Sequence, residues 1–238
     1  MRQLAQRWKM PVELALDLVA LALYDVIIYA DDSTSMKYNE DRIDDLKVIV
    51  SKVAEVATLF DDDGITVRYM NSKAQGDNLR TAHAASQFVL NNSNFEGMTP
   101  MATSLDAKII QPFVAEGVKR RNLQKPVLVI TVTDGEPTSE PETKIFQVIK
   151  AAKKMVSKSA YGAGAVAFEF AQVGRDQDAQ AFLARLDNDP EVGGMVDATS
   201  YYELEAEECA KKGVTLSPEL WLVKLMVGAV DPSYDDQD

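Results

Sequence analysis

The 238-residue chain contains one cysteine and one histidine. Cys209 has no cysteine partner, so no internal disulfide can form, and a reducing cytoplasmic compartment is the expected location. A histidine-dependent catalytic triad would rest on His83 alone, which we expect at the surface or packed at the start of a helix. Functions that depend on thiol or imidazole chemistry are therefore disfavoured.

Long apolar runs are missing too. The apolar segment 14–22 follows Glu13 and contains Asp17, and no small-residue cleavage pattern comes after it, so we do not expect an export signal. The region 18–30 is short and carries Asp25, so we expect no membrane span.

Positive charge is scarce. With 25 Lys and Arg against 37 Asp and Glu, the formal net charge is −12. Nucleic acids and anionic membrane surfaces would be repelled by much of such a surface. Cations or a basic partner are the more natural ligands, and the length suits one large domain.

Apolar periodicity predicts strands that alternate with helices. The residues from Val26 to Tyr29 form a uniformly apolar run typical of a central parallel strand, whereas Ile43, Leu46 and Val50 recur at helical spacing. The polar segment 71–80 stays unassigned, with a short edge strand as the alternative. The expected strands are 26–29, 65–69, 126–133, 165–173 and 195–199, and the expected helices are a lead-in from Met10-Pro11, then 41–60, 82–91, 101–119, 141–158, 177–187, 203–211 and 217–229.

This alternation predicts an α/β fold of three layers, doubly wound, with a mostly parallel central sheet flanked by helices. Two further features are acidic: the turn 61–64, which should end the second helix, and the tail 233–238, which should be solvated.

Oxygen-bearing side chains gather where two of the predicted strands end. Asp31-Asp32-Ser33-Thr34-Ser35 follows the first strand, Thr133-Asp134-Gly135 closes the strand 126–133, and a loop carrying Thr99 precedes a helix. Ligands bind at this edge of open α/β sheets. Hard oxygen donors suit Mg²⁺, Mn²⁺ or Ca²⁺ and do not suit zinc.

The spacing within the first loop separates its residues into two sets. Residues two apart can point the same way, so Asp31, Ser33 and Ser35 are expected to converge, while Asp32 and Thr34 point elsewhere. We expect Asp32 to lie in solvent; the alternative is that it ties the loop to a neighbouring backbone amide.

These motifs resemble the von Willebrand factor type A (vWA) family, whose metal-ion-dependent adhesion site (MIDAS) reads Asp-x-Ser-x-Ser, a distant Thr and a distant Asp. The resemblance implies that Ser33 and Ser35 bind the ion directly, that Thr99 binds directly or through water, and that Asp31 and Asp134 act largely through water. It also implies that the remaining coordination position accepts an acidic side chain of a partner protein.

The resemblance covers residues 24–205, which implies an N-terminal helical lead-in at 1–23 and C-terminal helices with an acidic tail at 206–238, packed on the same domain. One departure is Thr34, where the family often has glycine. If that position needs an unusual backbone conformation, a β-branched residue is unfavourable there.

The expected function is a non-enzymatic, intracellular module in which a divalent cation, Mg²⁺ first, bridges the protein to Asp or Glu of a partner. One alternative is a metal-dependent phosphatase or phosphotransferase with Asp31 as nucleophile, although Ser33 stands where such enzymes commonly carry a second Asp. Another alternative is an assembly role through the terminal helices, around Trp8 and Trp221. Partner identity and oligomeric state stay open.

Overall fold

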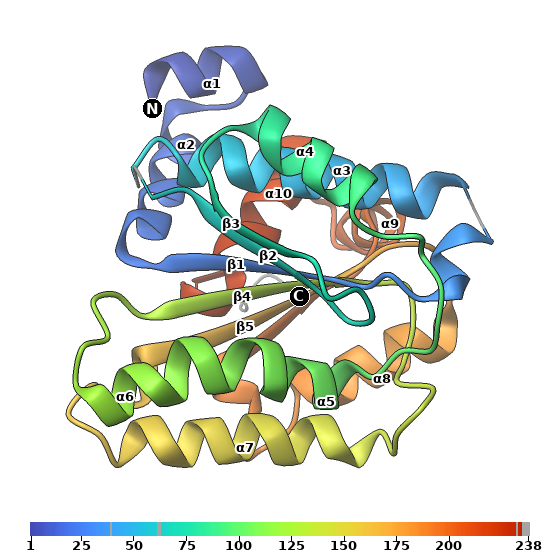
Figure 1. Cartoon of the computed structure of the whole chain (residues 1–238). Coiled ribbons are helices and arrows are strands. Elements are labelled where there is room, and N and C mark those ends of the chain that lie inside the picture. The colour runs from blue at the N-terminus through green and yellow to red at the C-terminus, as the bar shows by residue number, and fades with distance from the viewer. Residues whose placement is uncertain (39, 61–62, 232, 235–238) are drawn as a thin grey trace.

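A six-stranded sheet forms the middle layer of the protein, with strand order β3-β2-β1-β4-β5-β6 (Figure 1). All neighbouring strands are parallel except the antiparallel pair of β2 and β3. The computed structural model describes residues 1–38, 40–60, 63–231 and 233–234. The strands are β1 (Asp25–Ala30), β2 (Ile65–Tyr69), β3 (Gln75–Leu79), β4 (Val127–Thr133), β5 (Val166–Gln172) and β6 (Val196–Thr199).

Helices cover both faces of the sheet and complete a three-layer, doubly wound α/β fold (Figure 1). Helices α1 to α4 and α10 pack on one face, and α5 to α8 pack on the other. The helices are α1 (Arg2–Trp8), α2 (Val12–Asp17), α3 (Glu40–Ala57), α4 (Ala82–Asn91), α5 (Met101–Leu105), α6 (Glu116–Arg120), α7 (Thr143–Ser157), α8 (Gln177–Asp187), α9 (Tyr202–Lys211) and α10 (Pro218–Val227).

The unassigned segment 71–80 contains the edge strand β3. Its pairing with β2 buries only Gly76, while the other strand residues stay partly or fully exposed. Gly76 is needed because a Cβ there would lie 2.9 Å from the ring of Phe88. A polar edge strand has no alternating apolar pattern, so periodicity alone does not reveal it.

The expected helix 101–119 is helical throughout but not uniform. Between α5 and α6 the residues Asp106–Ala115 form a π-helical segment with Pro112 inside it. Proline lacks an N–H and disturbs the i→i−4 hydrogen-bond pattern, which accounts for the wider turn. The lead-in likewise changes character, because α2 continues as the 3₁₀ turn Leu18–Leu23. Residues 61–62 of the expected acidic turn and 235–238 of the expected tail lie outside the described residues.

Helix α10 is unusually well buried for a terminal helix. Every residue from Trp221 to Val227 is buried, and α10 contacts α2, the 3₁₀ turn after it, α3, β5 and β6. The Trp221 indole N–H also donates to the carbonyl oxygen of Ser200 at 2.9 Å. The two ends of the chain thus pack into one core with the sheet. Within the described ranges, no helix has both the length and the apolar character needed to cross a bilayer.

Candidate metal centre

The candidate centre begins at the neighbouring carboxyl ends of β1 and β4. Ala30 and Val132 are register partners, so the residues that follow them emerge side by side. The backbone N–H of Asp31 donates to Val132 at 2.9 Å, and the Thr133 hydroxyl donates to Asp31 Oδ2 at 2.6 Å. Asp31 is fully buried and held at the end of the central strand pair.

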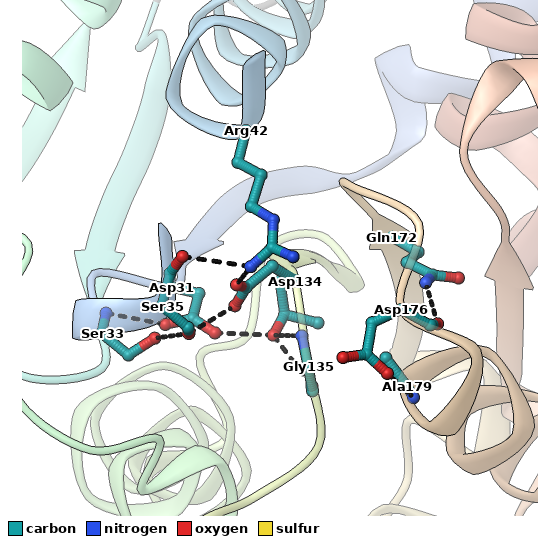
Figure 2. A network of polar contacts seen from close by, with 10 residues as sticks. Asp31, Ser33, Ser35, Arg42, Asp134, Gly135, Gln172, Asp176 and Ala179 are labelled. Atoms are coloured by element: carbon teal, nitrogen blue, oxygen red, sulfur yellow. Dashed lines mark hydrogen bonds and ion pairs between the residues drawn. The ribbon is translucent and has the colours of Figure 1, made fainter. Parts of the chain in front are cut away.

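Both serines and the second carboxylate lie beside Asp31 (Figure 2). The Ser33 N–H donates to Asp31 Oδ1 at 2.8 Å, and the two hydroxyl oxygens of Ser33 and Ser35 are 3.0 Å apart. The Ser35 hydroxyl in turn donates to Asp134 Oδ1 at 2.9 Å. A single hydrogen-bonded chain therefore joins four of the five residues expected at the site.

Thr99 is held by its backbone to the loop after β4. It is buried, and its N–H donates to Thr138 Oγ1 at 2.9 Å, which ties it to the loop after β4. Among the described residues, no hydrogen bond joins its side chain to the other four. The preceding residues are tied to the first loop, because Thr34 N–H donates to Gly97 O and Gly97 N–H donates to Thr34 Oγ1, both at 3.0 Å.

Thr34 fits its position without strain. It begins the 3₁₀ turn Thr34–Lys37, and it is not among the described residues with a positive φ. The loop at this point does not need the left-handed conformation that favours glycine. The threonine hydroxyl instead supplies the link to Gly97, so the departure at this position leaves the loop geometry intact.

Asp32 is buried, and the expectation that it lies in solvent is wrong. Its carboxylate accepts hydrogen bonds from the N–H groups of Asn71 at 2.7 Å and Ser72 at 2.8 Å, and from the Ser93 hydroxyl at 2.9 Å. These donors come from the loops after β2 and α4. Asp32 therefore clamps three loops together on the side away from Asp134.

Arg42, on α3, is a site residue that the sequence motif does not contain. Its Nη1 donates to Asp134 Oδ2 and, at 3.0 Å, to the carbonyl oxygen of Ser35 (Figure 2). It packs against Gly174, where φ is 80° and a Cβ would lie 2.6 Å from Arg42 Nε. The sequence contains one sign of this role. Arg42 is a cation among Asp41, Asp44 and Asp45 at the start of a helix, where acidic residues are favoured.

The electrostatics of the two carboxyls favour a cation. Burial, followed by the charge of Asp134, raises the pKa of Asp31 to about 6. Burial also raises the pKa of Asp134, against the opposing effects of Arg42 and the Ser35 hydrogen bond. A cation held between the two carboxylates would favour their ionised forms.

The donor set fits a hard divalent ion. Ser33, Ser35 and Thr99 would supply hydroxyl oxygens, and Asp31 and Asp134 would supply carboxylate oxygens. Adjacent oxygens around Mg²⁺ at its usual bond length are roughly 3.0 Å apart, which matches the separation of the two serine hydroxyls. The described part of the chain has no cluster of three His, Cys, Asp or Glu that could hold a metal.

Comparison with known proteins identifies related chains. A family model described as "vWA-TerF-like: vWA found in TerF C terminus" matches residues 23–212. A structure of proximal thread matrix protein 1 from the mussel byssus is similar over 89% of this chain and 48% of its own, at 16% identity and a TM-score of 0.50. Another structure of that protein, described as having a zinc-occupied MIDAS motif, matches 79% of this chain and 46% of its own, at 18% identity and a TM-score of 0.44.

The chain thus spans about half the length of the mussel protein. At 16% identity, the first likeness shows a shared fold alone. No match is found among curated proteins.

Proposed function

Since the chain belongs to the vWA-TerF-like family, we propose that it is a protein-binding module that depends on a divalent cation. In this proposal Ser33 and Ser35 bind Mg²⁺, Mn²⁺ or Ca²⁺ directly, with Asp31, Asp134 and Thr99 around them. An acidic side chain of a partner protein takes the remaining position. The observation that carries the proposal is the hydrogen-bonded convergence of both serines and both carboxylates at the ends of β1 and β4.

The chain's own residues favour an ion that stays open to a further ligand. Hydroxyl ligands carry no charge, so they leave the charge of the cation incompletely neutralised. The Thr133 hydroxyl and the Ser33 N–H hold the Asp31 carboxylate in one orientation. When bound, the ion would supply the positive charge that attracts the acidic group of the partner.

Two exposed side chains in segments next to the site loops suit contact with a protein. Tyr38, just after the first loop, is 75% exposed, and Met98, in the loop before α5, is 54% exposed. Tyrosine and methionine are enriched in protein interfaces. These two exposed side chains, next to the site loops in the sequence, support a protein partner over a small ion alone.

A non-enzymatic role, in the cytoplasm, is part of the proposal. Asp31 would be the nucleophile of a phosphotransferase, yet it is fully buried and both of its carboxylate oxygens accept hydrogen bonds. Such a carboxylate is poorly placed to attack a phosphate ester. Metal-stimulated hydrolysis of a generic phosphate ester that is lost in Asp31→Asn would overturn this part.

An assembly role is the second candidate, and it rests on the N-terminal rather than the C-terminal helices. Leu16, Val19 and Leu23, on α2 and the turn after it, are 51%, 40% and 66% exposed, whereas α10 is buried. A chelator separates the two candidates. Partner capture from native lysate that survives EDTA favours assembly through this stripe, and capture that EDTA abolishes favours the metal bridge.

Titration with Mn²⁺ tests the proposed site directly. Ser33→Ala combined with Ser35→Ala removes both direct ligands, so the affinity measured by calorimetry should fall roughly 100-fold or more. The control is Ser157→Ala with Ser233→Ala, two exposed serines, which should bind as the wild type does. Equal affinity in all three proteins, with unchanged urea unfolding, would reject the assignment.

A further inference from the structure

Arg42 brings a fixed positive charge to the proposed metal centre. Its Nη1 contacts the Asp134 carboxylate and the Ser35 carbonyl oxygen, so it touches two of the five residues assigned to the ion. The side chain is only 13% exposed, and its contact with Gly174 limits where the guanidinium can go. Arg175, one residue further along, instead pairs with Glu203 at 3.6 Å and is 71% exposed.

The contact engages the carboxylate completely. Ser35 donates to Asp134 Oδ1 and Arg42 donates to Oδ2, so neither oxygen is without a donor. An ion that uses Asp134, directly or through a water, has to share that carboxylate with a cation already hydrogen bonded to it. Like charges at this range oppose each other strongly where burial limits solvent screening.

The charges of the site point to a further consequence. Among the groups assigned to the ion and in contact with Arg42, two ionised carboxylates, Asp31 and Asp134, together with one guanidinium, sum to a single negative charge. Asp32 is left out of this sum because its carboxylate is held by the loops after β2 and α4. A divalent ion reverses that charge to a net positive one, and a carboxylate ligand then restores neutrality. Without the guanidinium, the ion alone would neutralise the site, and little charge would remain to draw the ligand.

We propose that Arg42 makes ion binding depend on the acidic ligand. It weakens the binding of a divalent ion alone, and it raises the affinity of the ion-bound site for a carboxylate ligand. This inference rests on the proposed function, because it concerns the same ion. Arg42 then acts as a positioning residue that also sets the charge of the site. The ion binds tightly only when an acidic ligand binds with it.

Mn²⁺ titration of Arg42→Gln by calorimetry tests the first half of the proposal. Removing the charge while keeping a polar side chain should tighten Mn²⁺ binding about tenfold or more, since a like charge at this range shifts such equilibria by one or more powers of ten. Arg42→Lys retains the charge and should stay within a few-fold of the wild type. Arg175→Gln, at the same edge of the sheet, should be unchanged. If Arg42→Gln proves too unstable to study, Arg42→Met removes the same charge.

Acetate tests the second half. At constant ionic strength made up with chloride, acetate should tighten Mn²⁺ binding to the wild type more than to Arg42→Gln. The tighter Mn²⁺ binding of Arg42→Gln should also disappear when this variant is combined with Ser33→Ala and Ser35→Ala. That loss would show that Arg42 acts on an ion bound at this site.

The outcomes separate this inference from the proposed function. Unchanged or weaker Mn²⁺ affinity in Arg42→Gln overturns the first half, and an equal acetate effect in both proteins overturns the second. Absence of Mn²⁺ binding in the wild type and in every variant overturns the proposed function itself.

Discussion

Two groups of buried acidic residues lie on the same sheet, and they differ in the hydrogen bonds that their carboxyl groups accept. At the carboxyl edge, Asp31, Asp32 and Asp134 each accept hydrogen bonds from at least two donors. Within the strands, Glu169 on β5 and Asp197 on the outermost strand β6 form a middle pair: they are register partners beneath α10, and both are buried. Among the described residues, Glu169 Oε1 and Oε2 and Asp197 Oδ2 have no hydrogen-bond partner.

The middle pair is also tightly enclosed. A Cβ on Gly228, just after α10, would lie 1.9 Å from Asp197 Oδ2, so only glycine lets the chain pass there. Burial, and then the neighbouring Asp197, raises the pKa of Glu169 well above its usual value, while Thr199 and Lys224 act in the opposite direction. A protonated Glu169 would supply a donor that the surrounding backbone does not.

Position along the strand explains the difference. Within a parallel ladder the backbone N–H groups are spent on neighbouring strands, whereas the loops beyond the strand ends have amides free to donate. Hydrogen bonds to Asp31 and Asp134 therefore lower their pKa values against the larger rise that burial causes, and a cation would favour their ionised forms further. At Glu169, burial instead raises the pKa well above its usual value.

Removing Asp32 should have the largest effect on stability. Asp32→Ala leaves the N–H groups of Asn71 and Ser72 and the Ser93 hydroxyl without their acceptor, which should cost about 3 kcal/mol. Urea unfolding measures this cost. Asp32→Asn, which keeps one acceptor oxygen, should lose less, and the exposed Asp41→Ala should lose almost nothing. A loss below about 1 kcal/mol for Asp32→Ala would contradict a donor-rich edge.

Neutralising Glu169 should change how stability depends on pH. Its folded pKa is raised above the unfolded value, so its contribution is fully present below the unfolded pKa and is lost as pH rises toward the folded pKa. Glu169→Gln has no such loss and can still donate to Asp197. Relative to the wild type, its unfolding free energy should therefore increase as the pH rises from 5 to 8.

Urea unfolding at several pH values follows this gain. The exposed Glu207→Gln serves as the control and should run parallel to the wild type. A difference between Glu169→Gln and the wild type that does not grow with pH would contradict a raised pKa for Glu169.

The smallest effect should come from Thr34 at the rim of the edge site. Thr34→Gly removes both side-chain links to Gly97 and adds freedom to the unfolded chain, at a cost of about 1 kcal/mol or less. Thr34→Ser keeps the hydroxyl and should lie nearer the wild type in thermal unfolding. A more stable glycine variant would mean that this loop prefers the backbone conformation reserved for glycine.

The parts of the fold that sequence patterns predicted are those with local signatures. Helix α4 occupies the predicted range 82–91, and β1 and β4 coincide with the two uniformly apolar runs. The polar strand β3 and the π-helical segment around Pro112 carry no such signature. The strand β3 depends on its pairing with β2, and the π-helical segment depends on the hydrogen bond that Pro112 interrupts.

The candidate site divides in the same way. The spacing of Asp31, Ser33 and Ser35 predicted their convergence, because the direction of side chains in one short loop is a local property. The expectation for Asp32 was wrong, since its donors lie in loops that only folding brings near. No local pattern distinguishes a solvated aspartate from a clamped one.

By itself, the sequence determined the alternation of strands and helices, the apolar centre of the sheet and the oxygen-rich loops at its edge, because each is written in neighbouring residues. Only the tertiary structure decided which partners those oxygens have. Arg42 and Asp134 are 92 residues apart, and Thr133 and Asp31 are 102 apart. Such contacts depend on strand order and register, which bring together side chains that no periodicity relates.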